Sequence, residues 1–142
     1  MSLEDIRVVV DAGESSPYRA DALSGNAPVL LHELAEHVRQ LVAAGESTAI
    51  DLNALPLTPA DLDWLKATLG EGEISVTLHS DGESTLAETA CPGIWWVNHH
   101  NEQGHVVSRF IEVAFVPELV KAHPEDVKTG LEHLESLIFD LS

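Results

Sequence analysis

The sequence predicts an α/β (α+β) fold, in which about three helices pack on an antiparallel or mixed sheet that contains a three-stranded meander. Three observations predict it. Apolar residues recur at three- and four-residue spacing in three segments, which is typical of amphipathic helices. Between the second and third of these segments apolar and polar residues alternate, which is typical of half-buried strands. Gly, Pro, Asp and Asn cluster between the segments and predict turns.

The composition favours one domain. The chain has 142 residues, of which 44% are hydrophobic and 22% charged, as in a globular protein. We expect residues 1–25 to form an N-terminal strand and loop, with the strand over 6–10 and the loop, rich in small and polar residues, extending from 11 to 28. Residues 26–142 then form a single domain.

Two helices and a short strand are expected in the first half. The first helix has its apolar stripe between Val29 and Val42, with Asn26 as N-cap and Gly45 as its stop. A strand is expected over 47–52. Thr58, followed by Pro59, predicts the start of a second helix, which ends at Gly70.

The second half carries the meander and the last helix. Its extended segments are 74–79, 84–98 and 105–116, joined by the turn at 81–82 and the loop 98–104. Pro92-Gly93 interrupts the middle segment and predicts a bulge or a sharp bend. Beyond Pro124 a helix is expected, and its apolar side carries Val127, Leu131, Leu134 and Ile138.

Charge excludes some functions. With 24 acidic and 7 basic residues, the formal charge is −17, so nucleic acid is not an expected partner. No apolar run approaches the roughly 20 residues of a membrane span, and the acidic N-terminus does not resemble a signal peptide, so we expect a cytoplasmic protein. The acidity is consistent with a solvated surface or with a face that attracts a basic partner segment.

Few residues suggest catalysis, and we expect no enzyme and no cofactor. The best metal candidate is a loop with His99, His100 and His105, to which Cys91 could add a fourth ligand. Adjacent histidines on a strand point to opposite sides, however, and the spacing matches no standard zinc pattern. A metal-binding or metal-delivery protein therefore remains the alternative.

Three further features have two interpretations each. Cys91 could be a nucleophile, but no cation is near it in sequence, which favours a small core thiol. Glu88 and Glu112 could form an acid–base pair, although such residues more often face solvent or accept backbone hydrogen bonds. Trp95-Trp96 places one ring on each side of a strand, so one ring could be an exposed anchor or both could be core.

Five short motifs, in this order and spacing, resemble the HupH/HyaF family of hydrogenase expression proteins. They are Ile50-Asp51-Leu52, Leu55 to Asp61, Leu69-Gly70-Glu71-Gly72-Glu73-Ile74, Glu88-Thr89-Ala90-Cys91-Pro92-Gly93-Ile94-Trp95 and Phe110-Ile111-Glu112-Val113. The resemblance extends from Asn26 to Leu134. Some members of the family carry two such units, whereas this chain has room for one.

The resemblance implies an accessory protein in the maturation of nickel–iron uptake hydrogenases. It implies as partners other maturation proteins and a hydrogenase precursor, with the iron–sulfur small subunit before twin-arginine export as the expected target. Our hypothesis is that Glu88, Pro92, Gly93, Trp95, Trp96 and Glu112 form part of the docking surface. A structural module that dimerises through an exposed sheet edge is a further alternative.

Overall fold

The computed structural model describes residues 22–142 and confirms the α+β class. Within these residues the sheet has five strands in the order β2-β6-β5-β4-β3, and every neighbouring pair is antiparallel. The strands are β2 (Thr48–Asp51), β3 (Ser75–His79), β4 (Glu83–Glu88), β5 (Ile94–His100) and β6 (Val106–Val113). The expected meander is confirmed, because the consecutive strands β3, β4, β5 and β6 are antiparallel neighbours in the sheet. The strand expected over 6–10 lies outside the described residues.

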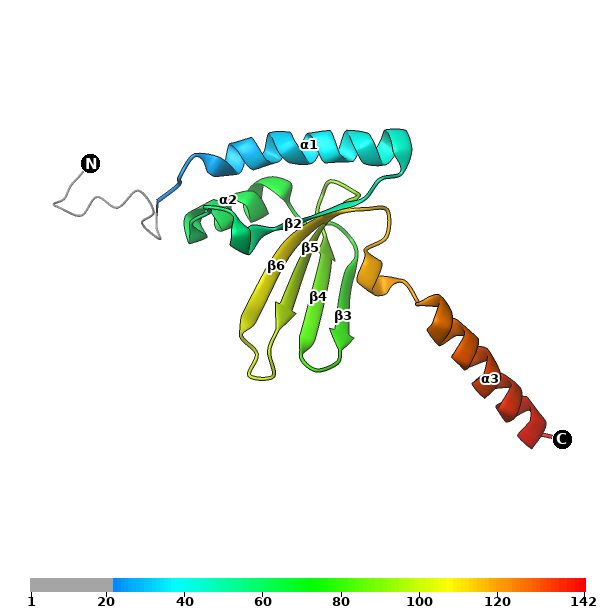
Figure 1. Cartoon of the computed structure of the whole chain (residues 1–142). Coiled ribbons are helices and arrows are strands. Elements are labelled where there is room, and N and C mark those ends of the chain that lie inside the picture. The colour runs from blue at the N-terminus through cyan, green and yellow to red at the C-terminus, as the bar shows by residue number, and fades with distance from the viewer. Residues whose placement is uncertain (1–21) are drawn as a thin grey trace.

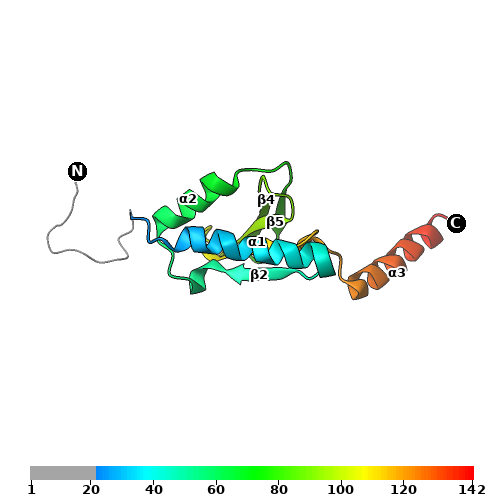
Figure 2. The ribbon, with the colours of Figure 1, turned by 90° about the horizontal axis from the view of Figure 1, so that it is seen from above.

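Two helices cover one face of this sheet. Helices α1 (Asn26–Ala44) and α2 (Pro59–Leu69) lie beside each other on the same side (Figures 1 and 2). Leu34 of α1 and Leu65 of α2 are fully buried. They belong to one hydrophobic cluster with Trp96 and Ile111 of the sheet. Burial of such side chains contributes about 1.5–3 kcal/mol each, so this layer is the main source of stability.

The ends of α1 differ in how well the sequence predicts them. Gly45 ends the helix as expected, in the left-handed conformation (φ 72°), and its N–H donates to the Leu41 carbonyl over 2.9 Å. The N-cap is Gly25 and not Asn26. Asn26 instead donates its side-chain amide to the Pro56 carbonyl over 2.8 Å, which ties α1 to the segment before α2.

The chain reverses direction at Pro92-Gly93, where the sequence predicted only a bulge or a bend. The segment expected as one long strand, 84–98, consists of β4 and β5, which pair with each other in antiparallel register from Ser84–His99 to Glu88–Trp95. The reversal depends on Gly93, whose φ of +97° is unfavourable for other residues. Strand β5 also extends to His100, so the loop that follows is shorter than expected.

The last helix does not pack on the sheet. After the short 3₁₀ turn Glu118–Val120, α3 (Pro124–Asp140) projects away from the body (Figure 1). Its expected apolar side is present, but none of its residues is buried. Periodicity specified the apolar side correctly, but the extended residues between the 3₁₀ turn and the helix direct α3 away from the core.

Within residues 22–142, no helix has both the length and the apolar character that crossing a membrane requires.

A buried carboxylate fixes the start of α2. Thr58 and Asp61 form a capping box, in which each side chain accepts a hydrogen bond from the other residue's backbone N–H. Asp61 also accepts hydrogen bonds from the backbone and hydroxyl of Ser24, so it joins the segment before α1 to α2. Burial opposes ionisation of Asp61, but the hydrogen bonds from Ser24 and Thr58 outweigh it and lower the pKa of this carboxyl.

We predict that Asp61→Asn lowers the free energy of unfolding at neutral pH by about 1–3 kcal/mol, because charge-assisted hydrogen bonds are lost. A carboxyl with a lowered folded-state pKa stabilises the fold above its unfolded-state pKa, and this contribution is lost as the pH falls through the folded-state value. The difference between wild type and variant should therefore shrink in acid. Urea unfolding at neutral and acidic pH measures it, with the exposed Asp63→Asn as control. An equal difference at both pH values would contradict the prediction.

Candidate functional site

Two of the family-like motifs, the one that begins at Leu69 and the one that begins at Glu88, lie against each other although they are far apart in sequence. We call the segments 69–73 and 88–95 together the motif junction. The Gly72 N–H donates to the Glu88 carbonyl over 2.8 Å, and the Ala90 N–H donates to the Leu69 carbonyl over 3.0 Å. These bonds join the connection between α2 and β3 to the connection between β4 and β5. The motifs therefore build one structural unit.

The glycines of the first motif are required by this contact. A Cβ added at Gly72 would lie 2.4 Å from the Thr89 carbonyl oxygen, well inside van der Waals contact. Gly70 has a φ of +71°, and a Cβ there would lie 3.0 Å from the Cβ of Ala90. Spacing alone could not reveal this, because the sequence does not show which segment the glycines face.

Thr89 holds the turn that follows β4. Its buried hydroxyl donates to the Cys91 carbonyl over 3.0 Å and accepts from the Cys91 N–H over 3.1 Å. The Ile94 N–H donates to the same Cys91 carbonyl over 3.0 Å. The backbone of Cys91 is thus fixed while its side chain is exposed. The expectation of a core thiol is wrong, because this residue lies in the chain reversal and not in a strand.

The end of β6 completes the junction. The Ala114 N–H donates to the Gly93 carbonyl over 2.9 Å, and the Trp95 indole N–H donates to the Ala114 carbonyl over 3.0 Å. Glu112 accepts a hydrogen bond from the Glu118 N–H over 3.0 Å. Glu112 therefore fills one of the roles expected for it, that of a backbone acceptor.

The two tryptophans lie on opposite faces of the sheet, as the alternation of a strand requires, and both are buried. Trp95 is 4% exposed and Trp96 is 8% exposed, so neither is the exposed anchor that the sequence left open. Trp96 belongs to the core under the helices, with the Lys66 ammonium 6.0 Å from its ring centroid. Trp95 lies on the face opposite the helices.

Carboxylates flank Trp95. The strand register places Glu88 on one side of it and Glu112 on the other, so these three residues form a row across β4, β5 and β6. The backbones of Glu88 and Glu112 are separated by two strand spacings, about 10 Å, with Trp95 on the strand between them. Exposed Glu71 and Glu73 lie on the adjoining connection. These four carboxylates form what we call the acidic rim of the junction.

A hollow of about 380 Å³ opens beside the rim, between α2 and the sheet. It is lined by Lys66, Glu71, Gly72, Ile74, Ser75, Ala87, Glu88, Trp96 and Asn98. Pro92 is exposed and Gly93 is half-buried at the reversal next to it. All six predicted docking residues therefore lie at one end of the sheet, where Trp95 is buried between the two glutamates and Trp96 belongs to the core and also lines the hollow.

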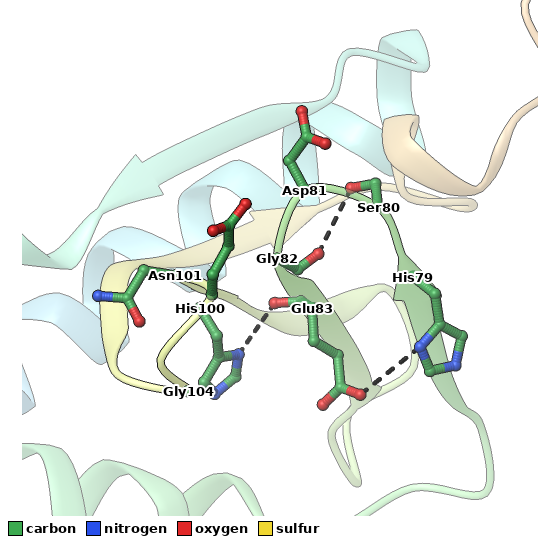
Figure 3. Close-up of a pocket in the computed structure, with 9 residues that line it drawn as sticks. His79, Ser80, Asp81, Gly82, Glu83, His100, Asn101 and Gly104 are labelled. Carbon is green, nitrogen blue, oxygen red and sulfur yellow. Dashed lines mark hydrogen bonds and ion pairs between the residues drawn. The ribbon is translucent and has the colours of Figure 1, made fainter.

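The opposite end of the sheet has a more open and more polar hollow (Figure 3). It lies between the β3–β4 and β5–β6 turns. His79 Nδ1 lies 3.7 Å from Glu83 Oε2, and His100 Nδ1 lies 3.0 Å from the Glu83 carbonyl oxygen. A Cβ on Gly82 would lie 2.1 Å from the His100 carbonyl oxygen, so the two turns are in close contact.

The histidines of the metal hypothesis are not brought together. His99 pairs with the Ser84 hydroxyl at 2.8 Å, whereas His100 contacts Glu83 on the other side of the strand. Cys91 lies beyond the other end of β5. Among residues 22–142, no three His, Cys, Asp or Glu side chains are grouped so that they could hold a metal ion.

The fold and the motif junction define a small α+β domain with helices on one face of an antiparallel sheet. Residues 25–140 match the family described as HupH hydrogenase expression protein, C-terminal conserved region. The chain therefore belongs to the HupH family, as its motifs implied.

Named relatives agree with this assignment. The hydrogenase expression/formation protein HoxQ of Azotobacter vinelandii is 31% identical over 82% of this chain and 42% of its own length. The hydrogenase-1 operon protein HyaF of Escherichia coli is 31% identical over 85% of this chain and 41% of its own. This chain thus spans about two fifths of the length of these relatives.

A solved structure shares the fold. The hydrogenase expression protein HupH from Thiobacillus denitrificans is 58% identical, with a TM-score of 0.80, and the match covers 84% of this chain and 99% of that one. The α+β domain described here is therefore also the architecture of a homologous chain.

We predict that Gly72→Ala destabilises the fold by about 2 kcal/mol or more, because the added methyl forces the Thr89 carbonyl away from the α2–β3 connection. Thermal unfolding measures the loss. Gly130→Ala, measured at low protein concentration, is the matched control, since in the single chain its new methyl meets open space within a helix. Equal melting temperatures for the two variants would show that the junction does not contribute to stability.

We also predict that Cys91 reacts in the native protein with a thiol reagent such as a maleimide, at a rate within about tenfold of that in the unfolded chain, because its side chain is exposed. Mass spectrometry after short exposure measures the modified fraction. Labelling that appears only after unfolding would restore the interpretation as a core thiol.

Proposed function

We propose that this chain is an accessory factor in the maturation of a nickel–iron hydrogenase and that it acts by holding a precursor chain and not by catalysis. Its relatives are named as hydrogenase expression or formation proteins. The described residues contain a junction in which backbone hydrogen bonds join two motifs, and Trp95 lies between Glu88 and Glu112 in the strand register.

The acidic rim is the observation that carries the proposal. It presents four carboxylates on a backbone that is fixed by hydrogen bonds from three segments, within a chain of charge −17. A partner segment rich in Arg and Lys would bind such a surface with little ordering cost on this side. The family resemblance implies such a partner, namely the twin-arginine leader of a hydrogenase small-subunit precursor.

Each proposed docking residue has a definite part. Glu88 and Glu112 attract the basic segment, while Pro92 and Gly93 form the fixed edge of the surface. Trp95 lies between the two glutamates and holds the β6 connection through its bond to Ala114. Trp96 supports β5 from the core side and lines the hollow beside the acidic rim.

We predict that Glu88→Gln/Glu112→Gln weakens binding of a purified small-subunit precursor with its leader by about tenfold, because two attractive charges are removed. Glutamine keeps an acceptor for the Glu118 N–H, so the fold should persist. Isothermal titration measures the dissociation constant, and circular dichroism checks the fold.

The matched control is Glu83→Gln/Glu102→Gln, which makes the same change in net charge at the opposite end of the sheet. This pair should change the affinity less than about threefold. Equal effects of the two double variants would reject the acidic rim as the contact. Failure of the wild-type protein to bind the precursor would reject the proposed function itself.

A further inference from the structure

Helix α3 presents an apolar seam with nothing against it among the described residues. Val127, Leu131, Leu134 and Ile138 are each more than half exposed, although they lie on one side of the helix. Their spacing of four, three and four residues is that of the a and d positions of a coiled coil. The helix has 17 residues, about 25 Å of seam, and it projects clear of the sheet and of α1 and α2 (Figure 1).

The two flanks of the seam differ in chemistry. In the heptad frame set by the seam, Lys128 and Glu135 occupy the two e positions along one flank. Gly130 and Leu137 occupy the g positions along the other flank, and Leu137 is 49% exposed. One flank thus carries a cation and an anion, and the other carries a small residue and a large apolar one.

We propose that α3 pairs with α3 of a second copy of this chain, in antiparallel orientation. When Leu131 faces Leu134 of the partner subunit, the seams interdigitate and each flank meets its own counterpart. Lys128 then lies opposite Glu135 of the partner subunit, and Leu137 lies over Gly130 of the partner subunit. Both matches occur twice because the pair is symmetric.

A parallel pair would not give these matches. It would set the e flank of one helix against the g flank of the other, so Glu135 would face Gly130 of the partner subunit and Lys128 would lose its opposite charge. The charge and size complementarity therefore specifies both the occupant and its direction. The interface would bury one helix of each chain, and each copy carries a net charge of −17. The dimer should therefore be weak and reversible, and it should form best at physiological ionic strength, where salt screens the repulsion between the two copies.

Sedimentation velocity over a range of protein concentrations tests this self-association. Wild type should shift from monomer to dimer, and Leu131→Asp should remain monomeric at every concentration. Since no α3 side chain is buried in the part of the chain that the structure describes, this variant should keep the wild-type melting temperature and circular dichroism. A wild-type protein that stays monomeric at the highest concentration would overturn the inference. This holds even if α3 then proves to dock on another protein.

A charge-swap cycle tests the orientation. Lys128→Glu and Glu135→Lys should each weaken the dimer by roughly tenfold, because each turns two attractive contacts into repulsive ones. The double variant Lys128→Glu/Glu135→Lys should recover the wild-type association, since the pairing is only inverted. A double variant as weak as either single one would overturn the antiparallel arrangement. None of these outcomes depends on precursor binding, so the inference and the proposed function can fail separately.

Discussion

The backbone hydrogen bonds from Gly72 to Glu88 and from Ala90 to Leu69 fix the geometry on which the rest of the site depends. They connect the end of the helical layer to the reversal between two sheet strands. Because the carbonyl of Thr89 occupies the space of a side chain at Gly72, the contact requires glycine. The position of the acidic rim and the reversal at Gly93 both follow from this junction.

The structure thereby separates two kinds of surface. At the motif junction, charged side chains stand on a backbone that several segments hold in place, which suits recognition of a basic chain at low entropic cost. On α3, apolar side chains stand on a helix that the body does not cover, which suits association with another helix. The first surface relates to the proposed maturation role, and the second relates to assembly of the protein with itself.

The sequence predicted features that depend on local chemistry. Thr58 and Pro59 predicted the start of α2, because a capping hydroxyl and a preset φ act within one turn. The alternation at Trp95-Trp96 predicted opposite faces correctly. The exposure of Cys91, the pairing of β4 with β5 and the lack of cover over α3 were missed. Each of these depends on which distant segment lies opposite, and periodicity carries no such information.

Amide hydrogen exchange by NMR tests the junction most directly. If the two motifs form one rigid unit, the Gly72 and Ala90 amides should exchange as slowly as the Glu88 amide, whose N–H is bonded to the Ile74 carbonyl at the end of the sheet. Exchange of Gly72 and Ala90 at the rate of exposed loop amides, while Glu88 stays protected, would contradict the account. In that case the acidic rim would stand on a mobile loop.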